Sequence, residues 1–367
     1  MPQKTTSSKS MTFFKSYISK PSPKCRLYRP PMIKDFFLTL LLLLSLFSNT
    51  TSLCAETSKI APLENSAESA LSDSSDYLNY IDCLILGVVE GITEYLPISS
   101  TGHLLITNEL LGLNSAILIS DEYTLKEAAF AYIIIIQAGA ILAVIFLYWK
   151  TILQILMGFM GKNPKGRKLG LLLIIAFLPA AFIGLALNDW IEQQLGDNLI
   201  AIALALFLGG IVMLITEKRR TKEPGNPTQD QALSKLDELD QLNFKQALSI
   251  GFAQCLALWP GMSRSMVTII GGYWVGLAPK KAAEFSFLLG LITLSAASAY
   301  KVLTDGAMLT QTMDIQPMLI GCFVAFISAI YAIRFLVTCL TRYGLAPFAW
   351  YRIGLAFIII LFFLPKL

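Results

Sequence analysis

The chain has 367 residues, of which 55% are hydrophobic and only 15% charged, and its mean hydropathy is +0.62. Soluble domains carry about 25% charged residues, so the composition excludes an ordinary soluble protein. The net charge of +4 is small, and the basic residues flank apolar segments, which indicates topology signals and no nucleic-acid surface. The six cysteines show no paired spacing, so we predict neither a disulfide framework nor a zinc site.

The first 76 residues form a polar extension that contains one short apolar segment. Residues 1–35 are rich in Lys, Arg and Ser, residues 36–47 are apolar, and small residues follow near Cys54. This order is typical of a secretory signal; an uncleaved anchor fits it equally well, and a start at Met32 would give a signal of ordinary length. Residues 55–76 are polar and are expected to be disordered. We assign no chemistry to the extension.

Six apolar segments beyond the extension are long enough to cross a hydrocarbon core, which takes about 20 residues. They are residues 128–149, 169–187, 199–216, 282–300, 317–333 and 346–364. The loop 150–168 is basic, the loop 188–198 is acidic, and the segment after residue 216 begins with a basic cluster. Basic loops stay in the cytoplasm, so the loops are predicted to lie inside, outside and inside in that order.

Two other segments, 80–108 and 246–279, each consist of two short apolar halves around a turn that contains Pro and Ser. The flanking charges place both ends of the first segment outside and both ends of the second inside. Each segment is therefore predicted to be a re-entrant hairpin. Broken backbone at membrane depth must be buried in protein or line a polar cavity.

The two hairpins share a sequence pattern. Gly87-Val-Val-Glu90 before Tyr95-Leu-Pro-Ile-Ser-Ser parallels Gly251-Phe-Ala-Gln254 before Leu258-Trp-Pro-Gly-Met-Ser-Arg-Ser, and three spans follow each. An odd number of spans inverts the second copy. The predicted fold class is an all-α polytopic membrane protein with two inverted repeats, each a re-entrant helical hairpin plus three transmembrane helices. The repeats cover 80–216 and 245–367 of a membrane domain 77–367, joined by a cytoplasmic linker 217–244.

The first hairpin carries two acids and a lone histidine. Glu90 and Glu94 are four residues apart and share one helix face, which suits a divalent cation or a shared proton; an acid pair that faces water is the alternative. Ser99, Ser100 and Thr101 are good helix caps, and the start of a helix suits phosphate. His103 follows Ser100 by three residues, so the two can form a nucleophile–base pair, although a structural role is the usual one for a single histidine.

The second hairpin carries Arg264 between Ser263 and Ser265 at its own helix start. No acid is near Arg264 in the sequence, so an anion is expected to meet it in space. A planar guanidinium with two serine caps is typical of a phosphate clamp. The alternative is a structural ion pair between Arg264 and Glu90 or Glu94.

At these residues the chain resembles the undecaprenyl-diphosphatase family of bacterial bacitracin-resistance phosphatases. The family's first motif is present as Glu90-Gly-Ile-Thr-Glu94 and runs into Leu96-Pro-Ile-Ser-Ser-Thr-Gly-His103. Its second motif is present as Pro260-Gly-Met-Ser-Arg-Ser-Met-Val-Thr268, with methionines where relatives usually have Thr and Gly. The resemblance covers roughly residues 78–367.

The resemblance implies hydrolysis of undecaprenyl diphosphate to the monophosphate and phosphate in the bacterial inner membrane, at a site open to the periplasm. It implies Glu90 and Glu94 as ligands of a divalent cation, Mg²⁺ or Ca²⁺. Ser100 is then the nucleophile unless a cation-activated water attacks, and His103 is a base or phosphate ligand. Arg264 would stabilise the transferred phosphoryl group. The supporting substrate-binding residues would be Ser99, Thr101, Ser263 and Ser265.

Three other functions compete with this one. Acid-phosphatase-like lipid phosphatases need a second histidine, and the chain has one, so that class is excluded. A transporter of the lipid monophosphate fits inverted repeats but needs no nucleophile. A purely structural subunit leaves the buried charges unexplained. For the phosphatase, the expected partners are a polyprenyl diphosphate lipid as substrate and the bilayer. A homo-oligomer is possible, and the sequence does not decide the oligomeric state.

Overall fold

The computed structural model describes residues 79–118, 123–196, 198–221, 238–312 and 315–363. The signal or anchor segment and most of the predicted linker 217–244 lie outside these residues. The described chain consists of helices and turns, with one isolated bridge between Leu118 and Thr124. The predicted all-α fold class is therefore confirmed.

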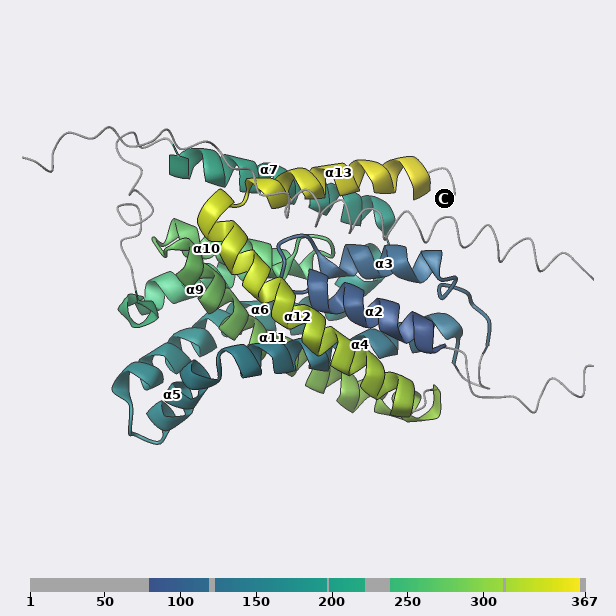
Figure 1. Ribbon diagram of the computed structural model, residues 1–367, viewed down its shortest axis with the longest axis horizontal. Coiled ribbons are helices and arrows are strands. Elements are labelled where there is room, and N and C mark those ends of the chain that lie inside the picture. Colours follow the sequence, from purple (N-terminus) through teal and green to yellow (C-terminus); the bar gives the residue numbers. More distant parts are fainter. Residues whose placement is uncertain (1–78, 119–122, 197, 222–237, 313–314, 364–367) are drawn as a thin grey trace, which may run out of the picture. The chain divides into compact units, whose positions relative to one another are not determined.

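Six long helices carry the six predicted spans. They are α4 (Leu125–Leu147), α6 (Pro164–Leu195), α7 (Leu199–Thr221), α11 (Pro279–Thr312), α12 (Ile315–Tyr343) and α13 (Ala346–Phe363) (Figure 1). The first five contain an apolar stretch long enough to cross a membrane, and α13 is a shorter apolar helix. Most run beyond the predicted ends, because hydropathy marks only the part of a helix that faces hydrocarbon. The chain is a multi-pass membrane protein.

The loops predicted at 150–168 and 188–198 are largely helical, which corrects the sequence analysis. After a break at Tyr148, helix α5 (Trp149–Phe159) continues the chain, and α6 starts already at residue 164 and runs to residue 195. Helix α5 packs on α6, and several of its large apolar side chains are exposed. Lysines on both sides of these apolar residues made the segment look like a loop.

Both predicted hairpins are pairs of short helices. They are α2 (Tyr80–Thr93) with α3 (Ser100–Leu110), and α9 (Phe244–Cys255) with α10 (Arg264–Trp274), the second pair joined through the 3-10 turn η2 (Leu256–Leu258). Helices of 11 to 14 residues are about 16–21 Å long, too short for a core of about 30 Å. In the second hairpin Gln246 Nε2 donates to the Val275 carbonyl at 3.0 Å, so both ends of the hairpin lie together.

The basic starts of α6 and α11 lie near the same short segment. Lys165 at the start of α6 pairs with Asp240 at 3.3 Å, in the 3-10 turn η1 (Leu239–Gln241). Lys281 at the start of α11 pairs with Glu238 at 3.5 Å. The α5–α6 connection, the end of the predicted linker and the start of α11 therefore lie together, as the charge pattern predicts for loops on one side of a membrane.

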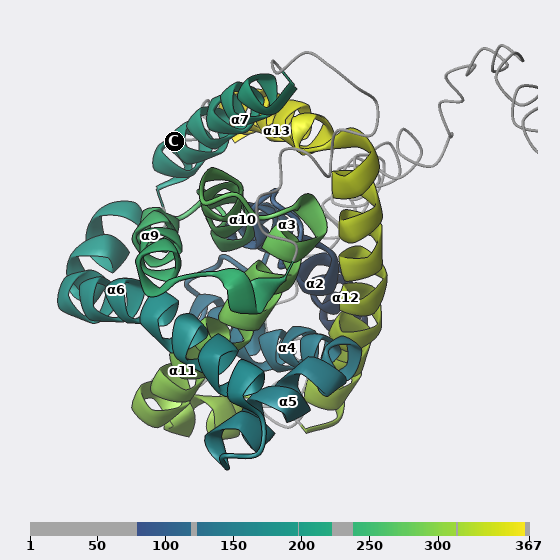
Figure 2. The same ribbon diagram turned by 90° about the vertical axis from the view of Figure 1, so that its left-hand side faces the viewer.

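Helices α3 and α10 lie in the interior of the bundle, enclosed by the longer helices (Figure 2). Every residue from Gly102 to Asn108 of α3 and from Ser265 to Gly272 of α10 is buried. Around them α7 pairs with α13, α2 packs on α12, and α9 packs on α6. The turns of the two hairpins consequently meet inside the bundle.

Candidate active site

The two hairpin turns end in the same unusual backbone conformation. Ser99 caps α3 with φ 76° and ψ 104°, and Ser263 caps α10 with φ 70° and ψ 113°. Among the described residues, only these two have a positive φ without being glycine. Each hydroxyl accepts a hydrogen bond at 3.3 Å from a backbone N–H, that of Gly102 or Met266. Such conformations cost about 1–3 kcal/mol, persist only where the surrounding structure holds them, and cluster at functional sites.

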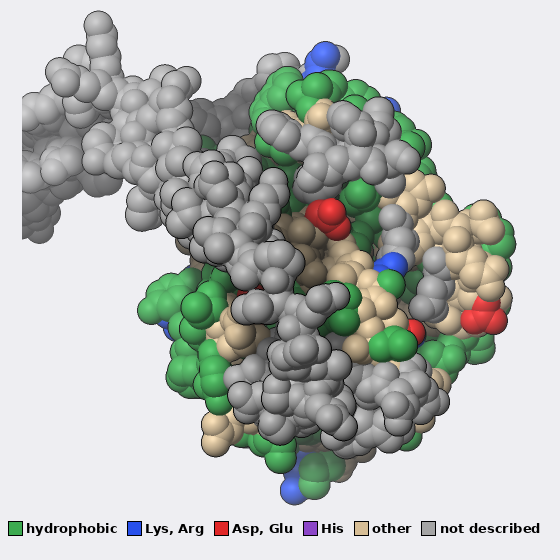
Figure 3. Space-filling model, turned by 90° about the vertical axis from the view of Figure 1, so that its right-hand side faces the viewer, with side chains coloured by type: hydrophobic (Ala, Val, Ile, Leu, Met, Phe, Trp, Pro, Cys, Tyr) green, Lys and Arg blue, Asp and Glu red, His purple; other side chains and the backbone are tan. Residues whose placement is uncertain are grey.

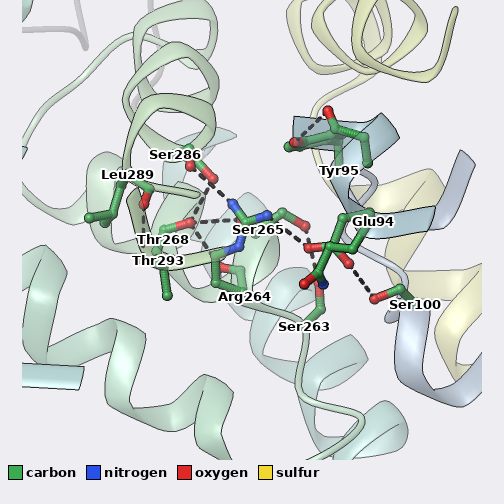
Figure 4. A network of polar contacts seen from close by, with 12 residues as sticks. Glu94, Tyr95, Ser100, Ser263, Arg264, Ser265, Thr268, Ser286, Leu289 and Thr293 are labelled. Carbon is green, nitrogen blue, oxygen red and sulfur yellow. Dashed lines mark hydrogen bonds and ion pairs between the residues drawn. The ribbon is translucent and has the colours of Figure 1, made fainter. Parts of the chain in front are cut away.

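Glu94 connects the two hairpins (Figure 4). Its Oε1 accepts from Arg264 Nη2 at 3.0 Å, and its Oε2 accepts from the Ser100 hydroxyl at 2.6 Å. Arg264 Nη1 donates to the Ser286 carbonyl of α11 at 3.1 Å, while its Nε has no partner among the described residues. The ion pair with Glu94 is the structural alternative named in the sequence analysis, and the phosphate clamp stays a prediction; the two hydrogen bonds leave three of the five guanidinium N–H groups unused.

Glu90 lies one helical turn before Glu94 and is 1% exposed. Its Oε1 has no hydrogen-bond partner among the described residues. Two ionised carboxylates beside one guanidinium leave one negative charge uncompensated, which is costly in a buried place. A proton on one carboxylate or a bound cation would neutralise this charge. The described residues form no cluster of three or more His, Cys, Asp or Glu, so a cation here would need substrate oxygens or water as further ligands, as Mg²⁺ commonly does.

His103 is fully buried, and both of its ring nitrogens are engaged. Nδ1 donates to the Ser99 carbonyl at 2.6 Å, which leaves Nε2 to accept from the Tyr351 hydroxyl of α13 at 2.7 Å. The Ser100 hydroxyl is bonded to Glu94. This arrangement differs from the predicted pairing of Ser100 with His103, because a carboxylate is a stronger acceptor than a neutral imidazole that is already engaged.

The remaining predicted residues lie around the same point. Ser265 Oγ donates to the Leu96 carbonyl of the first turn at 3.0 Å, and Ser263 Oγ lies 3.1 Å from Ser265 Oγ. The second hairpin thereby holds the backbone of the first. Thr101 is exposed in the first turn of α3.

One face of the molecule is hollowed, and acidic and basic side chains are visible there among backbone and other side chains (Figure 3). Four of the predicted site residues are only partly buried: Glu94, Ser100, Ser263 and Arg264. Four others are buried: Glu90, Ser99, His103 and Ser265. The groups of the first set are thus suited to touch a ligand, and those of the second set to hold them in place.

The sequence analysis missed residues that position this cluster. The Tyr95 ring centroid lies 5.7 Å from Arg264 Cζ, and the Tyr95 hydroxyl donates to the Ala140 carbonyl at 2.9 Å. Arg352 is fully buried and contacts both hairpin turns. A charge inside the apolar segment 346–364 was a usable signal for Arg352. No sequence signal marks Tyr95.

Gly290 of α11 provides the space for the Arg264 guanidinium. A Cβ at this position would lie 2.5 Å from Arg264 Cζ. Gly290→Ala is expected to displace the flexible end of Arg264 from Glu94 while α11 stays intact, and to lower kcat on the order of tenfold or more. Steady-state phosphate release measures the effect. Gly354→Ala is the matched control, because a Cβ there meets nothing within 4 Å; equal activity in the two variants would contradict the prediction.

Comparison with known proteins adds an independent line of evidence. The family described as bacitracin resistance protein BacA matches residues 83–358 of the chain. An undecaprenyl-diphosphatase of Sorangium cellulosum is 40% identical over 283 residues, which cover 77% of this chain and 85% of that protein. An undecaprenyl-diphosphatase of Ectopseudomonas mendocina is 42% identical over 277 residues, 76% of this chain and 91% of that protein. The chain therefore belongs to the BacA family of bacitracin resistance proteins.

Proposed function

We infer that the protein hydrolyses undecaprenyl diphosphate to undecaprenyl phosphate and inorganic phosphate. The reaction recycles the lipid carrier of cell-wall synthesis and gives bacitracin resistance. Family membership and relatives named undecaprenyl-diphosphatase support this function. The observation that carries it is the pair of contacts that Glu94 makes. One carboxylate binds both an arginine suited to hold phosphate and a serine suited to attack it.

The Ser100 hydroxyl is the proposed nucleophile toward the terminal phosphorus. Its proton passes to Glu94 Oε2, 2.6 Å away, as the new O–P bond forms. The bond from phosphorus to the bridging oxygen breaks, and undecaprenyl phosphate leaves. Water then attacks the phosphoserine: the bond from Ser100 Oγ to phosphorus breaks, Oγ takes back the proton held by Glu94, and inorganic phosphate leaves with both protons of the water. In the alternative, water attacks the phosphorus directly and gives its proton to the same carboxylate.

The other polar groups bind and stabilise charge. Arg264 would stabilise the transferred phosphoryl group, which spreads charge over three oxygens, through guanidinium N–H groups that Glu94 and Ser286 leave unused. The starts of α3 and α10 present backbone amides to an anion, helped by the serines of the turns and Thr101. His103 holds the Ser99 carbonyl and so fixes the turn beside Ser100.

Glu90 and Glu94 fit a divalent cation, Mg²⁺ or Ca²⁺, as the negative charge and the unpartnered Oε1 of Glu90 indicate. When bound, the cation would neutralise charge on the diphosphate. Glu94 then combines two duties, as ligand and as acceptor of the Ser100 proton.

The test is phosphate release from undecaprenyl diphosphate by the purified protein in detergent, with and without a chelator. The wild type is expected to release phosphate, and Ser100→Ala to lose most of that activity. A transporter of the lipid monophosphate is the rival, because half-helices that meet inside a bundle also suit alternating access. A wild type that moves lipid between leaflets of a vesicle without releasing phosphate would establish the rival instead.

The contacts of the hairpins support an inverted repeat. Gly87, Glu90 and Ser99 correspond to Gly251, Gln254 and Ser263, each pair 164 positions apart. A Cβ on Gly87 would lie 2.6 Å from the Gly321 oxygen of α12, and one on Gly251 would lie 2.5 Å from the Ala176 oxygen of α6. Helices α12 and α6 occupy equivalent places in the two proposed repeats, so each hairpin packs closely on a helix of the other repeat.

The proposed orientation puts the first hairpin's ends in the periplasm and the basic face in the cytoplasm of the inner membrane. Single cysteines at the exposed positions Ala116 and Lys162 test this in a variant without its native cysteines. We expect a membrane-impermeant thiol reagent added to intact cells to label Ala116→Cys, and Lys162→Cys to react only after the cells are opened. Labelling of both positions from outside would contradict the orientation.

A further inference from the structure

Arg352 of α13 is 0% exposed, and its guanidinium donates to four backbone carbonyls. Nε donates to Leu206 at 3.3 Å, and Nη2 to Ala205 and Gly261 at 3.0 Å each. Nη1 donates to Pro97 at 3.5 Å. A buried charge without a carboxylate among these four acceptors costs stability, which calls for a compensating function.

The four acceptors show what that function is. Ala205 and Leu206 belong to α7, while Pro97 and Gly261 belong to the turns of the two hairpins. The two turn residues are 164 positions apart, the same separation that relates the two cap serines. Arg352 therefore binds the equivalent carbonyl in each hairpin. The Pro97 and Gly261 carbonyls lie outside the helices, and without the arginine these buried residues would have no hydrogen-bond donor to their carbonyls among the described residues.

The reacting groups follow directly on these turns. Glu94 and Ser100 flank the first turn, and Ser263 and Arg264 end the second. The neighbouring side chain of α13, Tyr351, binds His103, which in turn binds Ser99. Two adjacent residues of α13 thus fix both turns against α7.

We propose that Arg352 is a positioning residue that sets the separation of the two hairpin turns, and with it the distance from Ser100 and Glu94 to Arg264. The proposal rests on the proposed phosphatase function. It predicts that displacing the guanidinium lowers turnover more than substrate binding, because misplacing catalytic groups by about 1 Å costs up to roughly a hundredfold in rate.

Two adjacent glycines of α7 allow the guanidinium to be displaced without removing it. A Cβ on Gly209 would lie 2.9 Å from Arg352 Cζ, the flexible end of that side chain. A Cβ on Gly210 would lie 2.7 Å from Ile353 Cγ1 and 3.0 Å from the Ala349 oxygen. Gly209→Ala therefore pushes on the guanidinium, and Gly210→Ala crowds the same helix pair without touching it.

The experiment compares wild type, Gly209→Ala, Gly210→Ala and Arg352→Lys, purified in detergent, by kcat, KM, Tm and hydrogen–deuterium exchange. For Gly209→Ala and Arg352→Lys we expect kcat to fall tenfold or more while KM changes by less than about threefold. Exchange should rise in peptides that cover residues 94–99 and 258–263. Gly210→Ala should keep a kcat within about threefold of the wild type, since the guanidinium stays in place.

The proposal is overturned if Gly209→Ala keeps a normal kcat or if both glycine variants lose kcat equally. It is also overturned if the kcat of Gly209→Ala falls only because a lower Tm leaves less of the protein folded during the assay. If Arg352→Lys does not fold, the glycine pair still decides. A wild type that releases no phosphate refutes the proposed function but not the proposed contact. In that case, faster exchange of both turns in Gly209→Ala and not in Gly210→Ala still supports the contact, and unchanged exchange refutes it.

Discussion

Replacing Arg264 by lysine is expected to lower kcat about a hundredfold or more, comparable to losing an oxyanion donor. The guanidinium binds Glu94 through Nη2 and the Ser286 carbonyl through Nη1, and it keeps Nε free. The N–H groups on these three nitrogens lie in one rigid plane. A lysine ammonium keeps the charge but lacks the fork, so it cannot bind Glu94, Ser286 and a phosphoryl oxygen in the same geometry.

The substrate affinity of Arg264→Lys should fall less than its turnover. The backbone amides at the starts of α3 and α10 still bind phosphate in the ground state, whereas the arginine is needed as charge develops during transfer. Steady-state kinetics on purified variants separates kcat from KM. Arg334→Lys, which changes an exposed arginine of α12, is the control. Near-normal turnover in Arg264→Lys would make Arg264 a structural charge and would leave the chemistry to the two glutamates.

The sequence predicts the hairpins well because their signals are local. A proline and serine turn between short apolar halves, with charges at membrane depth, identifies both segments and the serines that cap α3 and α10. The six spans are equally visible in hydropathy. Helix α5 and the polar ends of α6 and α12 are not, since hydropathy reports contact with lipid and helices continue beyond it.

The partners inside the site are beyond the reach of such local signals. Glu94 and Arg264 are 170 residues apart, and His103 and Tyr351 are 248 residues apart. Helical spacing alone put Ser100 beside His103, but the competing carboxylate of Glu94 binds the hydroxyl instead. Gly290 and Tyr95 act on the site only through their contacts with Arg264, which depend on how distant helices pack. Packing between distant helices, which a single sequence does not specify, decides these contacts.

Glu94→Gln is expected to abolish phosphate release, to below about 1% of the wild-type rate, because a general base and a charge partner are lost together. The carboxylate accepts one hydrogen bond on each oxygen, from Arg264 and from the Ser100 hydroxyl. Glutamine has one oxygen and one NH₂ group. An NH₂ group that faces Arg264 loses that hydrogen bond, and one that faces Ser100 donates to the hydroxyl and cannot accept its proton; the negative charge is lost in both orientations.

The same change should leave the protein folded and weaken its response to divalent cations. Glutamine matches the shape of the side chain it replaces, and the Glu90 carboxylate still balances the charge of Arg264, so Tm should change little. The measurements are phosphate release as a function of Mg²⁺ or Ca²⁺ concentration, together with Tm. Glu109→Gln, in an exposed position of α3, should behave as the wild type.

Two outcomes would contradict these roles. Substantial phosphate release by Glu94→Gln would show that Glu94 is not the proton acceptor. Wild-type rates that survive exhaustive chelation would show that the reaction needs no divalent cation. In the second case the uncompensated charge of Glu90 and Glu94 must be carried by a proton, and the transferred phosphoryl group would depend on Arg264 and the helix amides alone.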